Sequence, residues 1–411
     1  MTKVRLHQIF FGLLIFFLPT QLGRHFWPDF SFIFGLRLDY LSPTLYLTDL
    51  LALATLVIWW WQERKIRNIS RVNWLIFFIF FYLFINSLLA QNQGAAFYKL
   101  TKIAEFAWLG FYVTKNTKTK VIMGKILPVV VVYSGLIALF QVFKQSSLDG
   151  FFWFLGERTF SAGTPGIALA QSFGHLHLRP YGTFSHPNSM SGFLLVALIL
   201  IWGLGKNSPF WLKILASFFG FLVILLSFSR IIWIATFLLG LWLVIGWLGS
   251  RRKVPSQPPV YFLLTLPFLI GTVFFFSGPS FFFEEATTQR INLAQATLLI
   301  IKESPLFGVG LNNFIVHLPK FWIQSGVYFL QPVHNIFLLV AAETGLIGLL
   351  VFIWFLWLMI KKLILEHQPF LLLALGVILF TGIFDHYWFT LQQNQLLATI
   401  VFGLAWSKIK V

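Results

Sequence analysis

Long apolar stretches recur from one end of the 411-residue chain to the other. Runs of about 18 or more such residues are typical of membrane-spanning helices. The first run, Leu6 to Leu18, lacks a small-residue cleavage site, so no removable signal peptide is expected. We expect twelve helices, in the apolar runs near 6–19, 43–61, 73–90, 97–114, 121–143, 187–204, 210–228, 230–249, 259–277, 334–360, 369–387 and 392–407. The pattern therefore predicts an all-α polytopic membrane protein, with residues 1–411 forming one integral membrane domain.

The composition agrees with this prediction. Hydrophobic residues make up 58% of the chain and charged residues 10%, which is more apolar surface than a water-soluble domain needs. The absence of cysteine excludes disulfides, cysteine-ligated iron–sulfur clusters and thiol chemistry within this chain.

The positive charge is distributed as a topology signal. A net charge of +17 could suggest nucleic acid as a partner. However, the cations gather in short clusters that fall in alternate connections, which places all of these connections on one side of the membrane. By this rule both termini are cytoplasmic, and no nucleic-acid partner is expected. The clusters are Arg64, Lys65, Arg67 and Arg71; Lys115, Lys118, Lys120 and Lys125; Lys206 and Lys213; Arg251, Arg252 and Lys253; Lys361 and Lys362; and Lys408 and Lys410.

Two long connections then lie on the outer side, at 144–186 and 278–333, the second between the ninth and tenth predicted helices. Aromatic-rich loops of this length are more typical of a cover over a site than of a transporter's short outer turns. Within the second loop, TTQRINLAQATLLIIKES predicts an amphipathic helix. Thr287 or Thr288 would be its N-cap, and Pro305 would end it.

Three residues on this predicted outer face could carry chemistry. Arg230 lies between two apolar runs, Arg290 in the first turn of the predicted loop helix, and His334 where the loop enters a long apolar run. Each has a simpler interpretation: a snorkelling arginine, a salt bridge to Glu284 or Glu285, and a capping histidine. Arginines pair with phosphate oxygens, and a neutral histidine can accept the proton of a hydroxyl group. Together these side chains could catalyse the displacement of a pyrophosphate by an alcohol.

A metal is the alternative way to hold a pyrophosphate, usually through paired carboxylates. The outer loops contain only scattered acids, with no Asp-x-Asp or Glu-x-Asp pair. We therefore expect neither a metal nor another cofactor. These acids are Asp149, Glu157, Glu284, Glu285 and Glu303.

Four motifs carry a resemblance to a known family. They are RPYGTFSHPNSMSGFLL (179–195), LLSFSRIIW (225–233), the stretch from Arg290 to ESPLFGVGLNNF, and VHNIFLLVAAETGLIGL (333–349). In this order, with a large outer loop before the His-Asn pair, the chain resembles the O-antigen ligase and polymerase superfamily of bacterial envelope glycosyltransferases.

The resemblance implies a C-type glycosyltransferase fold in the bacterial cytoplasmic (inner) membrane, with an active site facing the periplasm or cell exterior. Such an enzyme transfers a glycan from undecaprenyl diphosphate to an acceptor hydroxyl, by an inverting displacement without metal. In the ligases, two arginines that match Arg230 and Arg290 contact the diphosphate. The histidine that matches His334 is the base.

Four further residues of these motifs could support the site. Asn335 follows the candidate base, and Glu343 lies in the Glu-x-Gly pattern. Arg179 and His186 precede the sixth predicted helix, and for these two we favour a turn that leads into that helix over a catalytic role.

Three alternatives stay open. A ligase would use lipid A core, another lipid or a protein as acceptor, whereas a polymerase would use a second lipid-linked glycan, and the motifs are common to both. A flippase of lipid-linked sugars would need ionisable residues deep in several helices, and the sequence offers only Lys99, Lys102, Glu105 and Glu343. A structural partner within an envelope complex would leave the outer arginines and histidine without a role.

Overall fold

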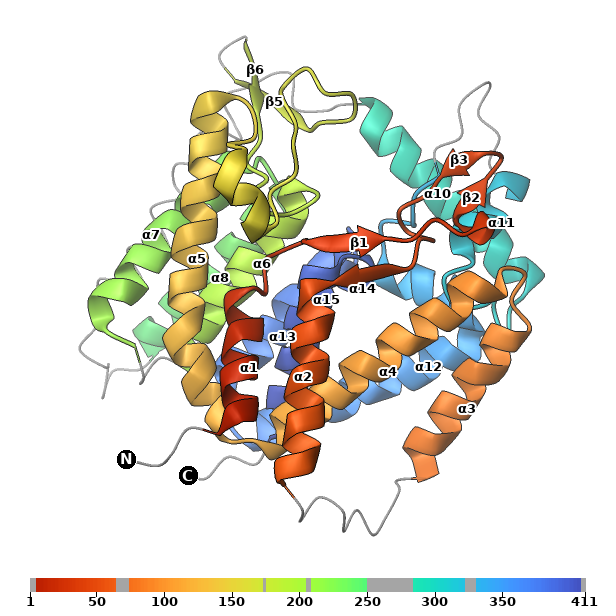
Figure 1. Cartoon of the computed structure of the whole chain (residues 1–411), viewed down its shortest axis with the longest axis horizontal. Helices are drawn as coiled ribbons and strands as arrows, with labels where there is room; N and C mark the ends of the chain where they lie inside the picture. The colour runs from red at the N-terminus through yellow and green to blue at the C-terminus, as the bar shows by residue number, and fades with distance from the viewer. Residues whose placement is uncertain are drawn as a thin grey trace.

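The structure, a computed structural model, describes residues 5–63, 74–172, 175–204, 208–249, 284–321 and 330–407. It is mostly helical, with three two-stranded antiparallel sheets (Figure 1). The helices are α1 (Leu6–Phe16), α2 (Leu47–Gln62), α3 (Trp74–Leu88), α4 (Gln93–Lys115), α5 (Lys118–Lys144), α6 (Pro187–Gly203), α7 (Phe210–Leu226), α8 (Arg230–Gly249), α10 (Glu284–Glu303), α11 (Phe314–Phe321), α12 (Ile336–Leu365), α13 (Pro369–Gly382), α14 (Tyr387–Thr390) and α15 (Gln392–Trp406). The strands are β1 (Gly23–His25), β2 (Phe32–Ile33), β3 (Leu36–Arg37), β4 (Thr44–Tyr46), β5 (Leu169–Ser172) and β6 (His175–Leu178).

Each predicted apolar run within the described residues contains a helix, and the run near 259–277 lies outside them. Helices α5 and α12 are each long and apolar enough to cross a membrane, and several shorter apolar helices have 10–17 residues. The chain is a membrane protein built from apolar helices, and the number of twelve spans stays a prediction.

Two predicted helix boundaries are wrong. Helix α10 begins at Glu284, upstream of the expected threonine cap, so Arg290 lies in the second turn rather than the first. The two consecutive glutamates at its start favour this earlier beginning, because acidic residues are stabilising at a helix N-terminus. Helix α13 ends at Gly382 instead of continuing to residue 387, so Asp385 and His386 lie in a connection between helices.

The helices pack around one large apolar core. It contains fully buried side chains from most of the helices, and α6 is buried on nearly all of its faces. Helix α15 packs against α4, α5 against α7, and α13 against α6. The segment that carries the candidate residues around His186 is therefore attached to a helix at the centre of the molecule.

A second, smaller core joins the loop helices to α12. Leu293 and Ile300 of α10, Phe314 and Leu318 of α11, and Leu339 of α12 are buried against one another. In Figure 1 the labelled strands and α10 lie toward the upper end of the helices. The described parts of the two long connections predicted to share one side of the membrane thus lie at the same end of the molecule; residues 173–174, 278–283 and 322–329 of these connections lie outside the described residues.

Helix α12 is broken at Gly345, whose φ of 67° lies in the left-handed region that favours glycine. The loop after α10 pairs with the backbone beside this break. Val309 N donates to Ala342 O at 2.9 Å, Gly310 N to Glu343 O at 3.0 Å, and Leu346 N to Pro305 O at 2.8 Å. The glycines of the SPLFGVG segment and of the Glu-Thr-Gly sequence therefore allow two backbones to approach closely.

Candidate active site

Asn335 caps the helix that follows His334. Its side-chain oxygen accepts hydrogen bonds from the backbone N–H groups of Phe337 and Leu338, each at 2.9 Å. An asparagine in this position satisfies orphan donors at a helix start. His334 is therefore not the capping residue, and its side chain is available for another role. Its Nδ1 is buried and has no hydrogen-bond partner among the described residues.

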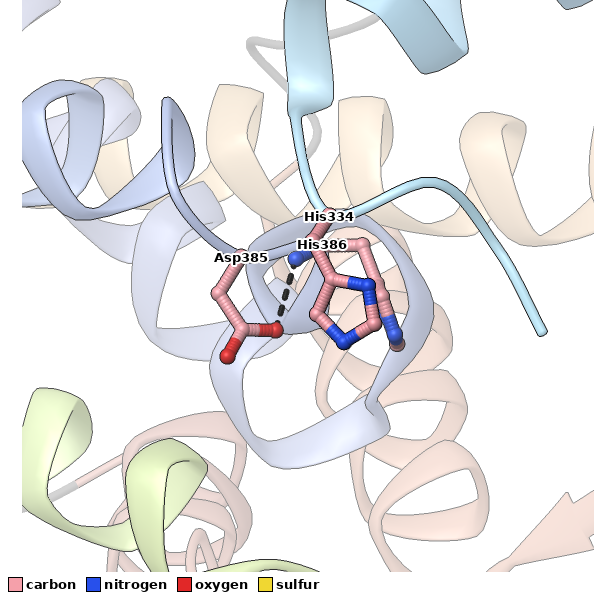
Figure 2. Close-up of side chains that lie close together, drawn as sticks. All are labelled: His334, Asp385 and His386. Carbon is pink, nitrogen blue, oxygen red and sulfur yellow. Dashed lines mark hydrogen bonds between the residues drawn. The ribbon is translucent and has the colours of Figure 1, made fainter. Parts of the chain in front are cut away.

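Asp385 and His386 lie beside His334 (Figure 2). The rings of His334 and His386 are 5.1 Å apart between centroids, at 66° to each other. Asp385 Oδ1 accepts the backbone N–H of His386 at 2.8 Å, and the Nδ1 of His386 is 2.7 Å from Thr390 Oγ1. The ligand atoms of His334, Asp385 and His386 all lie within 4.8 Å of one another, so these three residues could also hold a metal ion.

A small pocket opens next to Asp385. Arg290 of α10 and Ser229, the residue before Arg230, both line it. Asn188, at the start of α6, and Tyr387 also contribute to its wall. Four separate segments of the chain therefore meet at this pocket, and one of them carries the Asp385 carboxylate.

Arg179 is connected to Asp385 through Asn188. The Arg179 guanidinium donates to Ser227 O at 2.5 Å and to Asn188 Oδ1 at 2.7 Å. The Asn188 amide in turn donates to Asp385 Oδ2 at 3.2 Å. His186 is the N-cap of α6, where it accepts the backbone N–H of Asn188 at 3.1 Å. The turn predicted at this position is present, and the same turn places Arg179 and Asn188 at the site.

The environment keeps the histidines neutral. Burial, followed by the charge of Arg290, lowers the pKa of His334, and the charge of Asp385 opposes this effect. Burial lowers the pKa of His386 to about 3. Burial alone would raise the pKa of Asp385, but the neighbouring histidines and Arg290 hold it at about 2. An ionised aspartate thus faces neutral imidazoles that are ready to accept a proton.

The cations of the site outnumber its carboxylates. Burial, together with the charges of Arg290 and Arg230, lowers the pKa of Arg179 to about 10, so it remains a cation at neutral pH. Arg230 is the first residue of α8, is partly buried and interacts electrostatically with Arg290. The structure therefore brings the three arginines proposed from the sequence close to one another, with Asp385 as the described carboxylate among them.

Glu343 does not lie at this site. It is eight residues along α12 from Asn335, roughly 12 Å of helix rise. Its carboxylate interacts instead with Lys99 and with the backbone of Asn312 and Phe314. These contacts place Glu343 between the loop after α10 and the break in α12, and its support for catalysis stays a prediction.

Sequence reasoning missed Asp385 and His386 because they fall within an apolar run that was predicted to continue as a helix. The signal was present in FDHYW, residues 384–388, where two polar side chains interrupt the run. Asn188 was predicted only as part of a turn, because its link between Arg179 and Asp385 depends on contacts across nearly two hundred residues.

The chain was compared with known proteins. Residues 215–353 match the family model described as O-Antigen ligase. This segment includes Arg230, Arg290 and His334, and it confirms the resemblance predicted from the sequence over that part of the chain. No curated protein matches the chain. The residues Arg179, Asn188, Asp385 and His386 lie outside the matched segment, and of these Asp385 and His386 were recognised only in the structure.

Proposed function

We propose that this membrane protein is an O-antigen ligase-like glycosyltransferase of the bacterial cytoplasmic membrane, with its active site on the outer face. It transfers a glycan from undecaprenyl diphosphate to an acceptor hydroxyl, such as one on lipid A core. One observation carries this proposal. Arg290 and the residue before Arg230 line a pocket at Asp385, and His334 lies beside that carboxylate with a buried ring nitrogen that has no partner among the described residues.

The arginines in and around the pocket suit the diphosphate of the donor. Arg290 and Arg230 supply planar, permanently charged groups that pair with phosphate oxygens. Arg179 adds a further positive charge. Its guanidinium is held by hydrogen bonds to the Ser227 carbonyl and to the Asn188 side chain. These charges stabilise the negative charge that develops on the leaving diphosphate as its bond to the sugar breaks.

His334 is the general base in this proposal. A ring nitrogen takes the proton of the acceptor hydroxyl while the acceptor oxygen forms a bond to the anomeric carbon. The bond between that carbon and the diphosphate oxygen breaks from the opposite face, and its electron pair stays on undecaprenyl diphosphate, so the configuration inverts. The carboxylate of Asp385 stabilises the imidazolium that forms, because its charge raises the pKa of His334.

The reaction needs no metal in this proposal, since the arginines already neutralise the diphosphate. His334, Asp385 and His386 nevertheless form a ligand set of a kind that binds transition metals. An ion bound there would occupy the base and would therefore hinder the reaction as written. Treatment with a chelator tests this point, and a loss of activity that is restored by a divalent metal would contradict the metal-independent mechanism.

The acceptor is proposed to approach from the side of Tyr40, which is not part of the diphosphate pocket. The Tyr40 ring packs edge-on against His386 at 5.7 Å, and its backbone carbonyl accepts the Asn312 amide at 3.0 Å. Burial and the nearby carboxylates of Asp385 and Asp39 raise the pKa of Tyr40, so its hydroxyl remains a proton donor. A phenolic hydroxyl in this position can bind a sugar hydroxyl next to the base.

A transfer assay tests this function. The protein in proteoliposomes receives an undecaprenyl-diphosphate glycan and a candidate acceptor, with and without chelator. We expect a glycan–acceptor product and free undecaprenyl diphosphate in equal amounts. Growth of the glycan on its own lipid carrier would identify the polymerase alternative. Movement of an unaltered donor across the bilayer, without transfer, would instead identify the flippase alternative.

A further inference from the structure

An aromatic segment, residues 150–155, follows α5, and its rings are exposed at the surface of the protein. The 3₁₀-helix η3 (Gly150–Leu155) has no buried residue. Phe151, Trp153 and Phe154 have 70%, 53% and 60% of their surfaces exposed. Their rings lie against neighbours of the same segment, with Trp153 and Phe154 5.2 Å apart. Three large exposed aromatic groups in six residues form an apolar patch of a kind that marks a protein or membrane interaction site.

The base of this segment is held rigidly. The buried Glu157 carboxylate accepts the backbone N–H groups of Leu148 and Asp149, each at 2.8 Å. It also accepts the side-chain amide of Gln141 at 2.7 Å. The exposure of the rings is therefore built into the fold and does not follow from a loose loop.

The same contacts fix the depth of the segment along α5. Gln141 lies about one turn before Lys144, the last residue of that helix. The aromatic segment thus folds back beside the final turn of α5 instead of rising above it, as the yellow ribbon in Figure 1 shows. On α5 itself, Phe140 and Phe143 are 55% and 83% exposed at this level.

Among the described residues, helix α5 is one of two helices that are long and apolar enough to cross a membrane. Its exposed Phe140 and Phe143 are accordingly lipid-facing, and the aromatic segment continues this surface at the same depth. The segment is flanked by the exposed Arg158 and by Lys144, whose ammonium is paired with Asp149 at 3.7 Å. Aromatic rings beside lysine and arginine are typical of the boundary between lipid tails and headgroups.

We propose that residues 150–155 form an aromatic foot that is embedded in the outer leaflet of the bilayer beside α5. Phe151, Trp153 and Phe154 contact acyl chains near the headgroups, and Lys144 and Arg158 lie at the level of the lipid phosphates. The foot anchors the first outer loop, which leads to Arg179 and His186, at a fixed height above the bilayer. The depth of the foot rests on packing and exposure and does not require the proposed reaction, whereas its assignment to the outer leaflet rests on the predicted topology.

Site-directed spin labelling measures this depth directly, because the chain has no cysteine and each introduced cysteine is unique. The variants are Trp153→Cys and Phe151→Cys. Phe143→Cys is the lipid control, and His175→Cys on β6 is the aqueous control. Each nitroxide in proteoliposomes is exposed to oxygen, which concentrates in lipid, and to a water-soluble nickel chelate. We expect the labels at 151 and 153 to resemble the label at 143, with high oxygen and low nickel accessibility.

Two results would overturn the proposal. Labels at 151 and 153 that resemble the label at 175 would place the segment in water. Labels that neither reagent reaches would show that protein covers it, for example a second copy of the chain. A transfer assay on the same variants keeps the two proposals separate, since depth and turnover are measured independently.

Discussion

Two clusters of charged residues differ in how their charges are balanced. Between α2, α4 and α15, the Lys102 ammonium lies 2.5 Å from Asp49 and 3.0 Å from Glu105. The Asp49 carboxylate also accepts the amide of Gln392 and the backbone N–H of Tyr46. Each charged side chain in this cluster thus has a partner of opposite sign within the protein. Lys102 is shared by the two carboxylates, and one oxygen of Glu105 has no hydrogen-bond partner among the described residues.

The cluster around His334 has an excess of positive charge instead. Two arginines, Arg179 and Arg290, and three histidines interact with Asp385, and a buried nitrogen of His334 lacks a partner among the described residues. Buried charge without internal compensation is costly unless a ligand supplies the missing partner. The first cluster joins helices, whereas the second is proposed to be complete only when an anion is bound.

The largest expected effect comes from His334→Ala. General-base catalysis typically contributes about 10²–10⁴ in rate, and turnover should fall by that factor while donor affinity stays close to wild type. Turnover in proteoliposomes and binding of the lipid-linked donor are measured on the same preparation. His386→Ala is the matched control, because the His386 ring lies next to His334 but is hydrogen-bonded to Thr390. A larger loss in the control than in His334→Ala would identify His386 as the base.

Lys102→Met should affect stability and not chemistry. Removing one partner of a buried ion pair typically costs about 3–5 kcal/mol, so the unfolding midpoint in detergent should drop while turnover of the folded fraction is retained. Lys320→Met removes an exposed pair with Glu303 and should cost less than about 1 kcal/mol. Unchanged stability together with lost turnover in Lys102→Met would remove the distinction between the two clusters and would favour a transport role for the deep charges.

Arg290→Ala should weaken donor binding. A hydrogen bond to a charged group is worth about 1.5–3 kcal/mol, which corresponds to about 10–150-fold in affinity. Arg290→Lys should recover only part of this loss, since a point charge cannot reproduce the planar fork. Arg37→Ala, which removes an exposed arginine stacked on Trp27, controls for the lost charge. Equal losses in the two alanine variants would show that general electrostatic attraction, and not a specific contact, binds the donor.

The smallest expected effect is that of Tyr40→Phe. Loss of one neutral hydrogen bond costs about 0.5–1.5 kcal/mol, so the KM for the acceptor should rise about 2–12-fold while the KM for the donor is unchanged. Tyr98→Phe is the control, because the Tyr98 hydroxyl donates to the Thr44 carbonyl, which is four residues after Tyr40. A change confined to the donor KM would place Tyr40 on the diphosphate side instead.

The apolar runs predicted the helices well, because a helix in lipid needs little beyond length and the absence of charge. The same criterion hid Asp385 and His386, since two polar residues did not end the predicted run. Arg290 and His334 could be proposed from the sequence because they stand out against their surroundings. The proximity of His334 to a carboxylate 51 positions later could not be predicted, because it depends on how α12 and α13 pack.

The break in α12 gives a second example of this limit. Gly345 and the Glu-x-Gly pattern were noted as part of a family motif, but the sequence alone does not distinguish a catalytic from a structural glutamate. The structure shows that Glu343 and Gly345 meet the loop after α10, and that Asn86 of α3 donates to Phe307 O at 2.7 Å there. These contacts lie far apart in the sequence and have no local signature.

The pH dependence of kcat/KM for the donor tests the central claim most directly, because it reports the ionisation of the free enzyme. A base must be neutral, so the rate should rise with pH through the pKa of His334, which lies below its ordinary value of about 6.5. Asp385 raises this pKa and Arg290 lowers it. The acidic limb should therefore move to lower pH in Asp385→Asn and to higher pH in Arg290→Ala. An acidic limb that stays in place in both variants, or that persists in His334→Ala, would contradict the assignment of His334 as the base.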